Sequence, residues 1–175
     1  LSAVALDGYL YVVGGENPTG TGFDQGPQRT VYYAPINPAD GRVGEWQETS
    51  LLPIPLDKHL VVTYENEDTG LKTLFAIGGR SKLLSPPYTK YASEKVFFAD
   101  VQSDGSLTGW TESGGSLPRQ ILAHHGVQFR EQILATGGVD VKGTETTTET
   151  TIATVRAALI DPNNPTWRLY NRGGT

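Results

Sequence analysis

Asp40–Trp46, with the sequence DGRVGEW, returns as DGSLTGW at Asp104–Trp110. Both copies have seven residues, open with Asp-Gly and close with tryptophan, and the two tryptophans are 64 residues apart (110 − 46). Glycine tolerates positive φ and aspartate can hydrogen-bond its own turn, so each copy predicts a tight turn between two β-strands. We expect the tryptophan to begin the next strand and to pack between neighbouring units, where burial of the ring contributes about 2–3 kcal/mol.

A second sequence motif recurs at nearly the same spacing as the tryptophans. A Gly-Gly pair ends an apolar run three times, and a tryptophan follows the pair after 31, 31 and 29 residues. The pairs are Gly14 and Gly15, Gly78 and Gly79, and Gly137 and Gly138, and the tryptophans are Trp46, Trp110 and Trp167. The first two tryptophans are also followed by Leu-Pro and a histidine, at 52–59 and 117–124. Because independent marks recur in step, the chain contains a repeat of about 60 residues.

Each repeat carries four short apolar or alternating segments bounded by Gly, Asp, Asn and Pro, a pattern typical of β-strands. The expected strands are 2–6, 9–14, 30–36 and 44–49, then 59–65, 72–78, 94–101 and 109–113, then 123–129, 132–137, 152–160 and 166–170. No stretch keeps a 3.6-residue period, so we expect essentially no helix. Repeated four-stranded units predict an all-β fold of β-propeller blades. The chain is then a single propeller segment, 1–175, with blades at about 1–50, 51–115 and 116–175.

The Gly-Gly pair at the end of the second strand, followed by an aromatic pair and a tryptophan, resembles the kelch repeat over the whole chain. The units in this chain are longer than the usual kelch period of about 50 residues, and the excess lies between the second and third strands. The Asp-Gly, Trp and Leu-Pro arrangement is similar to kelch-type repeats of bacterial envelope or secreted proteins. The central domain of galactose oxidase also resembles these repeats, but its copper chemistry needs a cysteine-crosslinked tyrosine and this chain has no cysteine.

Three blades are too few for a closed ring, since closed propellers have typically four to eight. Open flanks would leave large apolar faces in water. We therefore expect either further blades in a longer parent chain, which is the simpler alternative, or a second copy that completes the ring. The start at Leu1, inside a strand-like stretch and without methionine, indicates a mature piece or a portion of something longer.

Composition excludes several classes of partner. The net charge of −5 argues against a nucleic-acid groove, which needs a basic stripe, and against an anionic membrane surface. No apolar run approaches the roughly 18 residues that a membrane span requires. The absence of cysteine removes thiolate zinc sites and thiol nucleophiles, and we expect no metal and no cofactor. The resemblance implies an extracellular or cell-envelope location, while the composition leaves the cytoplasm open.

Three long loops follow the Gly-Gly pairs, at 16–29, 80–94 and 139–150, and differ sharply in composition. The repeat predicts that all three emerge on the same face, and loops that differ while strands agree suggest a face diversified for binding. The candidate ligand- or partner-binding residues are Arg29, Arg80, Tyr88, Tyr91, Glu94, Arg119 and His125. His59 and His124 occupy matching positions, which predicts a repeated structural task such as a hydrogen bond to the backbone of the next blade.

These observations favour a kelch-type propeller that serves as a binding or assembly module. Its partner would be another protein or further blades, with a carbohydrate as a further candidate ligand. The alternative is a carbohydrate-active enzyme or sugar-binding propeller, with His125, Arg119 and Glu94 converging at the channel mouth. No recognisable acid/base pair or phosphate loop supports catalysis, so we assign no catalytic residue. A structural subunit of a larger surface assembly is the third interpretation.

Overall fold

The computed structural model describes residues 1–85, 87–117, 119–129, 132–141, 149–151, 155–159 and 168–170. For residues 23, 140 and 141 and for the last three of these ranges it describes the backbone alone. The described chain is built of antiparallel strands, with one short 3-10 turn at Gly22–Asp24. No helix in these ranges is long and apolar enough to cross a membrane.

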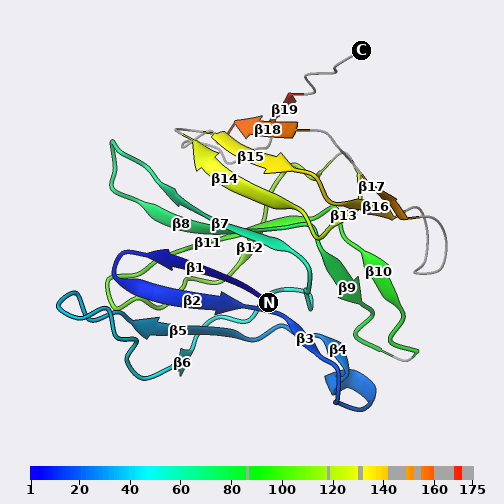
Figure 1. Cartoon of the computed structure of the whole chain (residues 1–175), viewed down its shortest axis with the longest axis horizontal. Helices are drawn as coiled ribbons and strands as arrows, with labels where there is room; N and C mark the ends of the chain where they lie inside the picture. Colours follow the sequence, from blue (N-terminus) through cyan, green and yellow to red (C-terminus); the bar gives the residue numbers. More distant parts are fainter. Residues whose placement is uncertain are drawn as a thin grey trace.

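Three four-stranded antiparallel sheets contain most of the strands (Figure 1). Sheet 1 consists of β1 (Ser2–Leu6), β2 (Tyr9–Val13), β5 (Val31–Pro35) and β6 (Gln47–Glu48). Sheet 2 consists of β7 (Leu60–Glu65), β8 (Lys72–Ile77), β11 (Val96–Asp100) and β12 (Thr111–Glu112). Sheet 3 consists of β14 (His125–Phe129), β15 (Gln132–Thr136), β18 (Val155–Leu159) and β19 (Arg168–Tyr170). The all-β prediction is confirmed, and these strands lie where the sequence pattern places them.

The three segments that the sequence predicts as long loops contain paired strands instead. They form the hairpins β3 (Glu16–Asn17) with β4 (Gly26–Pro27), β9 (Arg80–Lys82) with β10 (Lys90–Ala92), and β16 (Val139–Val141) with β17 (Glu149–Thr151), and β13 (Ile121–Leu122) pairs with β16. Strands of two or three residues are too short to show an alternating pattern, which is why the sequence did not reveal them. Figure 1 shows all three hairpins along one edge of the molecule, at the right of the view.

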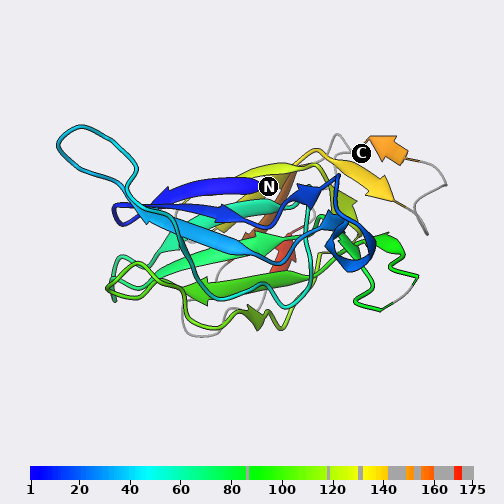
Figure 2. The same cartoon turned by 90° about the horizontal axis from the view of Figure 1, so that it is seen from below.

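Sheet 2 lies between the other two and is buried on both faces. Val61, Leu74 and Ala76 pack against sheet 1, whereas the alternate residues Phe75 and Ile77 pack toward sheet 3. The first strands of the three sheets are neighbours, β1 beside β7 and β7 beside β14, and Figure 2 shows the layers from below. A sheet covered on both sides needs apolar residues at every position, so the middle repeat reads as continuous apolar runs.

The Asp-Gly turns form as the sequence predicts. The carboxylate of Asp104 accepts a hydrogen bond from the Ser106 amide at 2.9 Å, and Gly105 has a φ of +81°. Trp110 then packs against the core between sheets 1 and 2, and its indole N–H donates to the carbonyl of Ser50 at 2.9 Å. Packing between units is thereby confirmed for Trp110. Trp46 instead remains 45% exposed, and Trp167 lies outside the described residues.

The first two Gly-Gly pairs each join one sheet to the linker that enters the next sheet. The amide of Gly15 donates to the carbonyl of Leu56, and the amide of Gly79 donates to that of Ile121, both at 2.8 Å. At Gly79 the φ is +90°, and a Cβ there would lie 2.6 Å from the carbonyl oxygen of Asp57. Glycine is required at this position both by the backbone conformation and by the close approach of the preceding linker, which joins sheets 1 and 2 and contains Asp57.

The two matched histidines pack against these glycines. A Cβ on Gly14 would lie 3.0 Å from Cε1 of His59, and a Cβ on Gly78 would lie 3.0 Å from Cε1 of His124. Both ring nitrogens of His59 are buried and accept or donate no hydrogen bond within the described ranges. The predicted hydrogen bond to a neighbouring backbone is therefore wrong for His59, because the ring is directed at a glycine turn. Packing against a glycine turn is the role that accounts for the matching positions of the two histidines.

We predict that Gly79→Ala destabilises the protein by about 3 kcal/mol or more, since it adds a backbone clash to a left-handed φ. Gly70→Ala is the matched control, because Gly70 has a φ of +68° and a Cβ there would meet no atom within 4 Å. It should cost about 1–2 kcal/mol, the conformational term alone. Urea denaturation of both variants measures the difference, and equal costs would contradict the close-approach role of Gly79.

Candidate functional site

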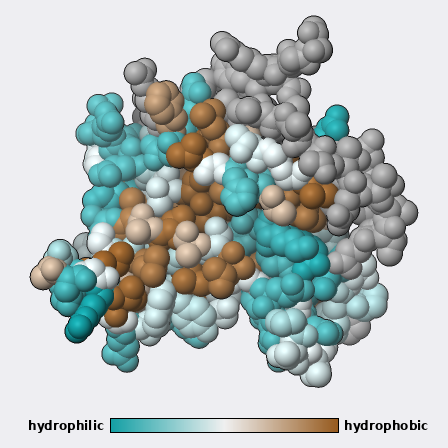
Figure 3. Space-filling model, in the orientation of Figure 1, coloured by the Kyte–Doolittle hydropathy of each residue, from teal (hydrophilic) through white to brown (hydrophobic). Residues whose placement is uncertain are grey.

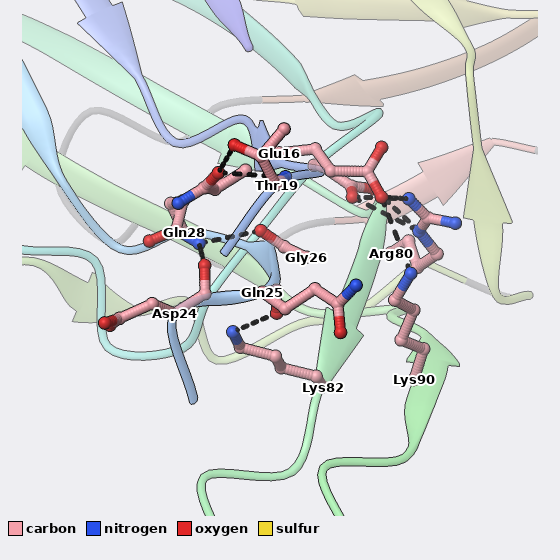
Figure 4. Close-up of polar contacts among 11 residues, drawn as sticks. Glu16, Thr19, Asp24, Gln25, Gly26, Gln28, Arg80, Lys82 and Lys90 are labelled. Atoms are coloured by element: carbon pink, nitrogen blue, oxygen red, sulfur yellow. Dashed lines mark hydrogen bonds and ion pairs between the residues drawn. The ribbon is translucent and has the colours of Figure 1, made fainter. Parts of the chain in front are cut away.

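A polar cluster lies between the β3–β4 hairpin, which follows the second strand of sheet 1, and the β9–β10 hairpin, which follows the second strand of sheet 2 (Figure 4). Arg80 begins β9 directly after the Gly-Gly pair, and Asp57 belongs to the linker between sheets 1 and 2. Their backbones pair reciprocally: the Asp57 amide donates to the Arg80 carbonyl at 2.9 Å, and the Arg80 amide donates to the Asp57 carbonyl at 2.7 Å. This bridge brings together two side chains that are 23 residues apart in the sequence.

The guanidinium of Arg80 binds two carboxylates. Nε donates to Oδ1 of Asp57 at 2.9 Å and Nη2 to Oδ2 at 2.7 Å, a bidentate pair, while Nη2 also donates to Oε1 of Glu16 at 2.8 Å. Asp57 is 2% exposed and the Arg80 side chain 13% exposed. Charge-assisted, bidentate hydrogen bonds fix geometry strongly, so Arg80 ties the linker and both hairpins together.

Glu16 lies at the more exposed rim of this cluster. Its carboxylate contacts the ammonium of Lys90 at 3.5 Å in addition to Arg80. Burial raises the pKa of Glu16, but the attraction of the Arg80 and Lys90 cations outweighs this effect, so that the pKa lies below its ordinary value. Glu16 therefore stays ionised at neutral and mildly acidic pH.

Lys82 makes a further connection between the two hairpins. The residue is 2% exposed, and its ammonium donates to the Gln25 carbonyl at 2.7 Å. Burial lowers the pKa of Lys82, with Asp24 acting against the shift and Lys90 adding to it. A buried lysine is stable only where its charge has partners, so the contact between the hairpins is specific and leaves them little freedom to move apart.

The candidate residues Arg80 and Arg29 form hydrogen bonds within the protein through their side chains. Arg80 is the centre of the cluster, and Arg29 donates from Nε to the Leu52 carbonyl at 2.6 Å. Tyr91 lies in β10 and Tyr88 lies in the turn before it, with a φ of +56°, and both are partly buried. The β9–β10 hairpin thus carries Arg80, Tyr88 and Tyr91 on one rigid element.

The remaining candidates lie on other segments. Glu94 is exposed between β10 and β11, and its carbonyl accepts a hydrogen bond from the Leu117 amide at 2.8 Å, which brings the segment before exposed Arg119 close to it. His125 is the first residue of β14 and is exposed. Its neighbour Gly126 is directed toward Leu60 of sheet 2, so the alternation of the strand directs His125 to the opposite face of sheet 3. Convergence of these three side chains stays a prediction.

The cluster is suited to holding shape rather than to proton transfer. Two cations, Arg80 and Lys90, face two carboxylates, Asp57 and Glu16. Within the ranges that the structure describes, no three potential metal ligands lie together.

Lys58, the residue after Asp57, is exposed and has a left-handed backbone conformation. Its carbonyl accepts a hydrogen bond from the Ala123 amide at 2.8 Å.

Asp57, Glu16 and Lys82 are members of this cluster that the sequence pattern did not single out. A signal was present for one of them: Asp57 lies two residues before the repeated histidine, and Arg80 directly follows a Gly-Gly pair. Glu16 and Lys82 carry no comparable mark, because their roles depend on how two hairpins from different repeats pack together.

The comparisons with known proteins show a similar fold in solved structures but identify no family. No protein-family model matches the chain, and no curated protein matches its sequence. A solved structure of YjhT is similar over 97% of this chain and 44% of that chain, with a TM-score of 0.63 and 12% identity. A chain of RAG, solved in complex with one melted and one unmelted RSS, is similar over 97% and 50%, with a TM-score of 0.59 and 17% identity. At such identities the likeness shows a shared fold, and the chain spans about half the length of either match.

We predict that Arg80→Ala lowers the free energy of unfolding by about 3 kcal/mol, because it leaves the Asp57 carboxylate buried without its cation. The Asp57→Ala, Arg80→Ala double variant should cost clearly less than the sum of the two single variants. Denaturation of the four proteins gives the coupling energy. Additive single effects would contradict the pairing.

A pH dependence follows from His59. Burial lowers the pKa of His59 from 6.5 to about 3, and the amino group of Leu1 and His124 add to the shift. Between about pH 3 and 6.5 the unfolded chain therefore binds a proton that the folded chain does not bind, and stability decreases as the pH is lowered through that window. We expect about 2 kcal/mol to be lost between pH 7 and pH 5. His59→Gln should remove this loss and His125→Gln, at an exposed position, should retain it; identical profiles would show that His59 is not responsible.

Proposed function

We propose that the three sheets are consecutive blades of a kelch-type β-propeller and that the chain serves as a binding module. Three sheets of the same strand order, adjacent first strands and the repeated Asp-Gly, Trp and Gly-Gly marks support the propeller. The likeness of fold to YjhT and to a RAG chain agrees with it. The kelch resemblance of the repeats also favours a protein that works outside the cell or in the cell envelope.

The binding surface in this proposal is the hairpin face, which we define as the exposed side of the β3–β4 and β9–β10 hairpins. The observation that carries the proposal is the network of Arg80, Asp57, Glu16 and Lys82, which joins hairpins from two repeats. A surface whose backbone is fixed before binding loses little conformational entropy when a ligand arrives. Loops that were mere tolerated insertions would not need a buried ion pair between them.

The exposed residues of the β9–β10 hairpin indicate what kind of ligand fits. Leu83 and Leu84 are 46% and 49% exposed at its tip, next to the partly buried Tyr88 and Tyr91. Lys90 is partly exposed where β10 begins, in the pair nearest the tip of the same hairpin. Apolar and tyrosine side chains around a small number of charges are typical of protein interfaces. The proposed ligand is therefore a protein or peptide.

A carbohydrate is the second candidate ligand. The hydrogen bond from the Leu117 amide to the Glu94 carbonyl draws together the segments that carry Glu94 and Arg119, and tyrosines at the neighbouring hairpin could stack on a sugar ring. In that case the protein would be a sugar-binding propeller or a carbohydrate-active enzyme.

A peptide-library selection on the purified chain tests the proposal. Selected peptides should bind through the β9–β10 hairpin, so that Leu84→Asp weakens their binding at least tenfold. Leu71→Asp is the matched control, because Leu71 is 43% exposed in the β7–β8 turn, at the opposite end of the molecule in Figure 1. Peptides whose affinity ignores Leu84→Asp would contradict the hairpin face as the binding surface. A glycan array probed in parallel tests the second candidate.

A further inference from the structure

The two ends of sheets 1 and 2 differ in charge. Five lysine and arginine residues and three carboxylates belong to the segments at the hairpin end, which are 16–29, 57–58 and 80–92. Two cationic residues and seven carboxylates belong to the turns at the opposite end, which are 7–8, 36–43, 65–72 and 100–106. The hairpin end is therefore net positive in a chain whose net charge is −5. A local field of this sign attracts anionic ligands to that end.

The surface of the hairpin end is polar around a small apolar tip. Figure 3, in the orientation of Figure 1, shows hydrophilic residues over the β3–β4 and β9–β10 hairpins, whereas hydrophobic residues gather over β1 and β2. Leu83 and Leu84 are the exposed large apolar residues of the β9–β10 hairpin. A cationic surface with an apolar tip is complementary to a ligand that carries both a carboxylate and an apolar group.

Lys58 is a cation of this end that the fold leaves without a partner. The other described lysines each form an ion pair or a hydrogen bond: Lys72 with Asp7, Lys82 with the Gln25 carbonyl, Lys90 with Glu16 and Lys95 with Glu112. Within the described ranges Lys58 forms neither, and it is the exposed residue of a run, 55–60, whose other members are all buried. Its ammonium is therefore available to a ligand.

The fold holds Lys58 in this exposed position without needing its side chain. Lys58 has a φ of +50°, which is uncommon for a residue other than glycine. Ala123, which also precedes a repeated histidine, has a φ of +54° and is exposed as well. Since an alanine is sufficient for this backbone, the lysine side chain has no role in the turn. Non-glycine residues held in left-handed conformations cluster at functional sites.

Lys58 lies next to the start of the β9–β10 hairpin. Its neighbour Asp57 pairs with Arg80 through the backbone, and Leu60 pairs with Ile77 at the end of β8 from which the hairpin leaves. The chain advances four residues from Arg80 to Leu84 (84 − 80), which is about 13 Å in an extended conformation. An extended peptide of about five residues spans the same distance, so one peptide reaches both the tip and Lys58.

We infer that the ligand of the hairpin face is an acidic peptide and that Lys58 binds one of its carboxylates while an apolar side chain of the peptide packs on Leu84. The inference rests on the proposed function and adds the chemical class of the ligand and the residue that recognises its charge. An ion pair at the rim of an interface contributes to the choice of partner and to the rate of association. Lys58 therefore selects acidic peptides over neutral ones.

Paired peptides test the inference. Peptides selected on the purified chain should be enriched in acidic residues, about four positions from an apolar residue. Each is then synthesised in two forms, with its acidic residue and with the matching amide, Gln for Glu or Asn for Asp. The amide form should bind the wild-type chain about fivefold more weakly, the upper range for an exposed ion pair. The two forms should bind Lys58→Ala equally, because the partner of the carboxylate is gone.

Two controls accompany this comparison. Lys58→Ala should have the urea midpoint of the wild-type chain, because Ala123 adopts the same backbone conformation. Lys72→Ala changes the net charge by the same amount at the opposite end, where Lys72 pairs with Asp7. This variant should still distinguish the acidic peptide from its amide form.

The possible failures are distinguishable. Selected peptides that depend on Leu84 but contain no acidic residue would overturn the inference and leave the hairpin face as the binding surface. A preference for the acidic form that persists in Lys58→Ala would assign the carboxylate to another cation and overturn the role of Lys58. A selection that yields no binding peptide would contradict the proposed function itself, and this inference with it.

Discussion

The hydrogen bond from the second glycine of the first two Gly-Gly pairs to the linker of the next repeat is the constraint on which the other features depend. Gly15 reaches the carbonyl of Leu56 and Gly79 reaches that of Ile121, both at 2.8 Å. The approach is so close that a Cβ on Gly14 would lie 2.4 Å from the carbonyl oxygen of Leu56, and a Cβ on Gly78 would lie 2.8 Å from that of Ile121. It fixes where each linker enters the next sheet, brings the first strands together and allows each repeated histidine to pack on the preceding glycine turn. Sheets joined in this way bury both faces of sheet 2, one in the apolar cluster shared with sheet 1 and the other in the apolar cluster shared with sheet 3.

The polar cluster is a consequence of the same contact. Because the linker passes directly beside the start of the β9–β10 hairpin, Asp57 and Arg80 can pair through backbone and side chain together. Arg80 then binds Glu16, and Lys82 binds the Gln25 carbonyl, so two hairpins that differ in sequence become one surface. The glycines and linkers of the repeats fix the backbone. The hairpin tips differ in sequence between repeats and present different residues to solvent.

The sequence was sufficient for features that each repeat determines locally. The strand segments, the Asp-Gly turns and the packing of Trp110 follow from alternation, turn chemistry and the size of an indole ring. Features that depend on two repeats at once could not be predicted: no pattern within one repeat indicates that Asp57 and Glu16 bind the Arg80 guanidinium. The two tryptophans make the same point, since Trp46 and Trp110 share a motif but differ in burial because only Trp110 has a neighbouring sheet to pack on. The ligand roles of all seven candidates stay predictions: Arg29, Arg80, Tyr88, Tyr91, Glu94, Arg119 and His125.

Native-state hydrogen exchange, followed by NMR, tests the central role of the Gly-Gly contacts most directly. If these contacts hold the sheets together, the amides of Gly15 and Gly79 exchange only when the whole protein unfolds, and they do so as slowly as the amides of β7 and β8. If they exchange as fast as amides in the exposed turns, the linkers open independently of the sheets. In that case the order of the sheets would have to depend on side-chain packing alone, and the hairpin face would lack the fixed backbone that the proposed binding requires.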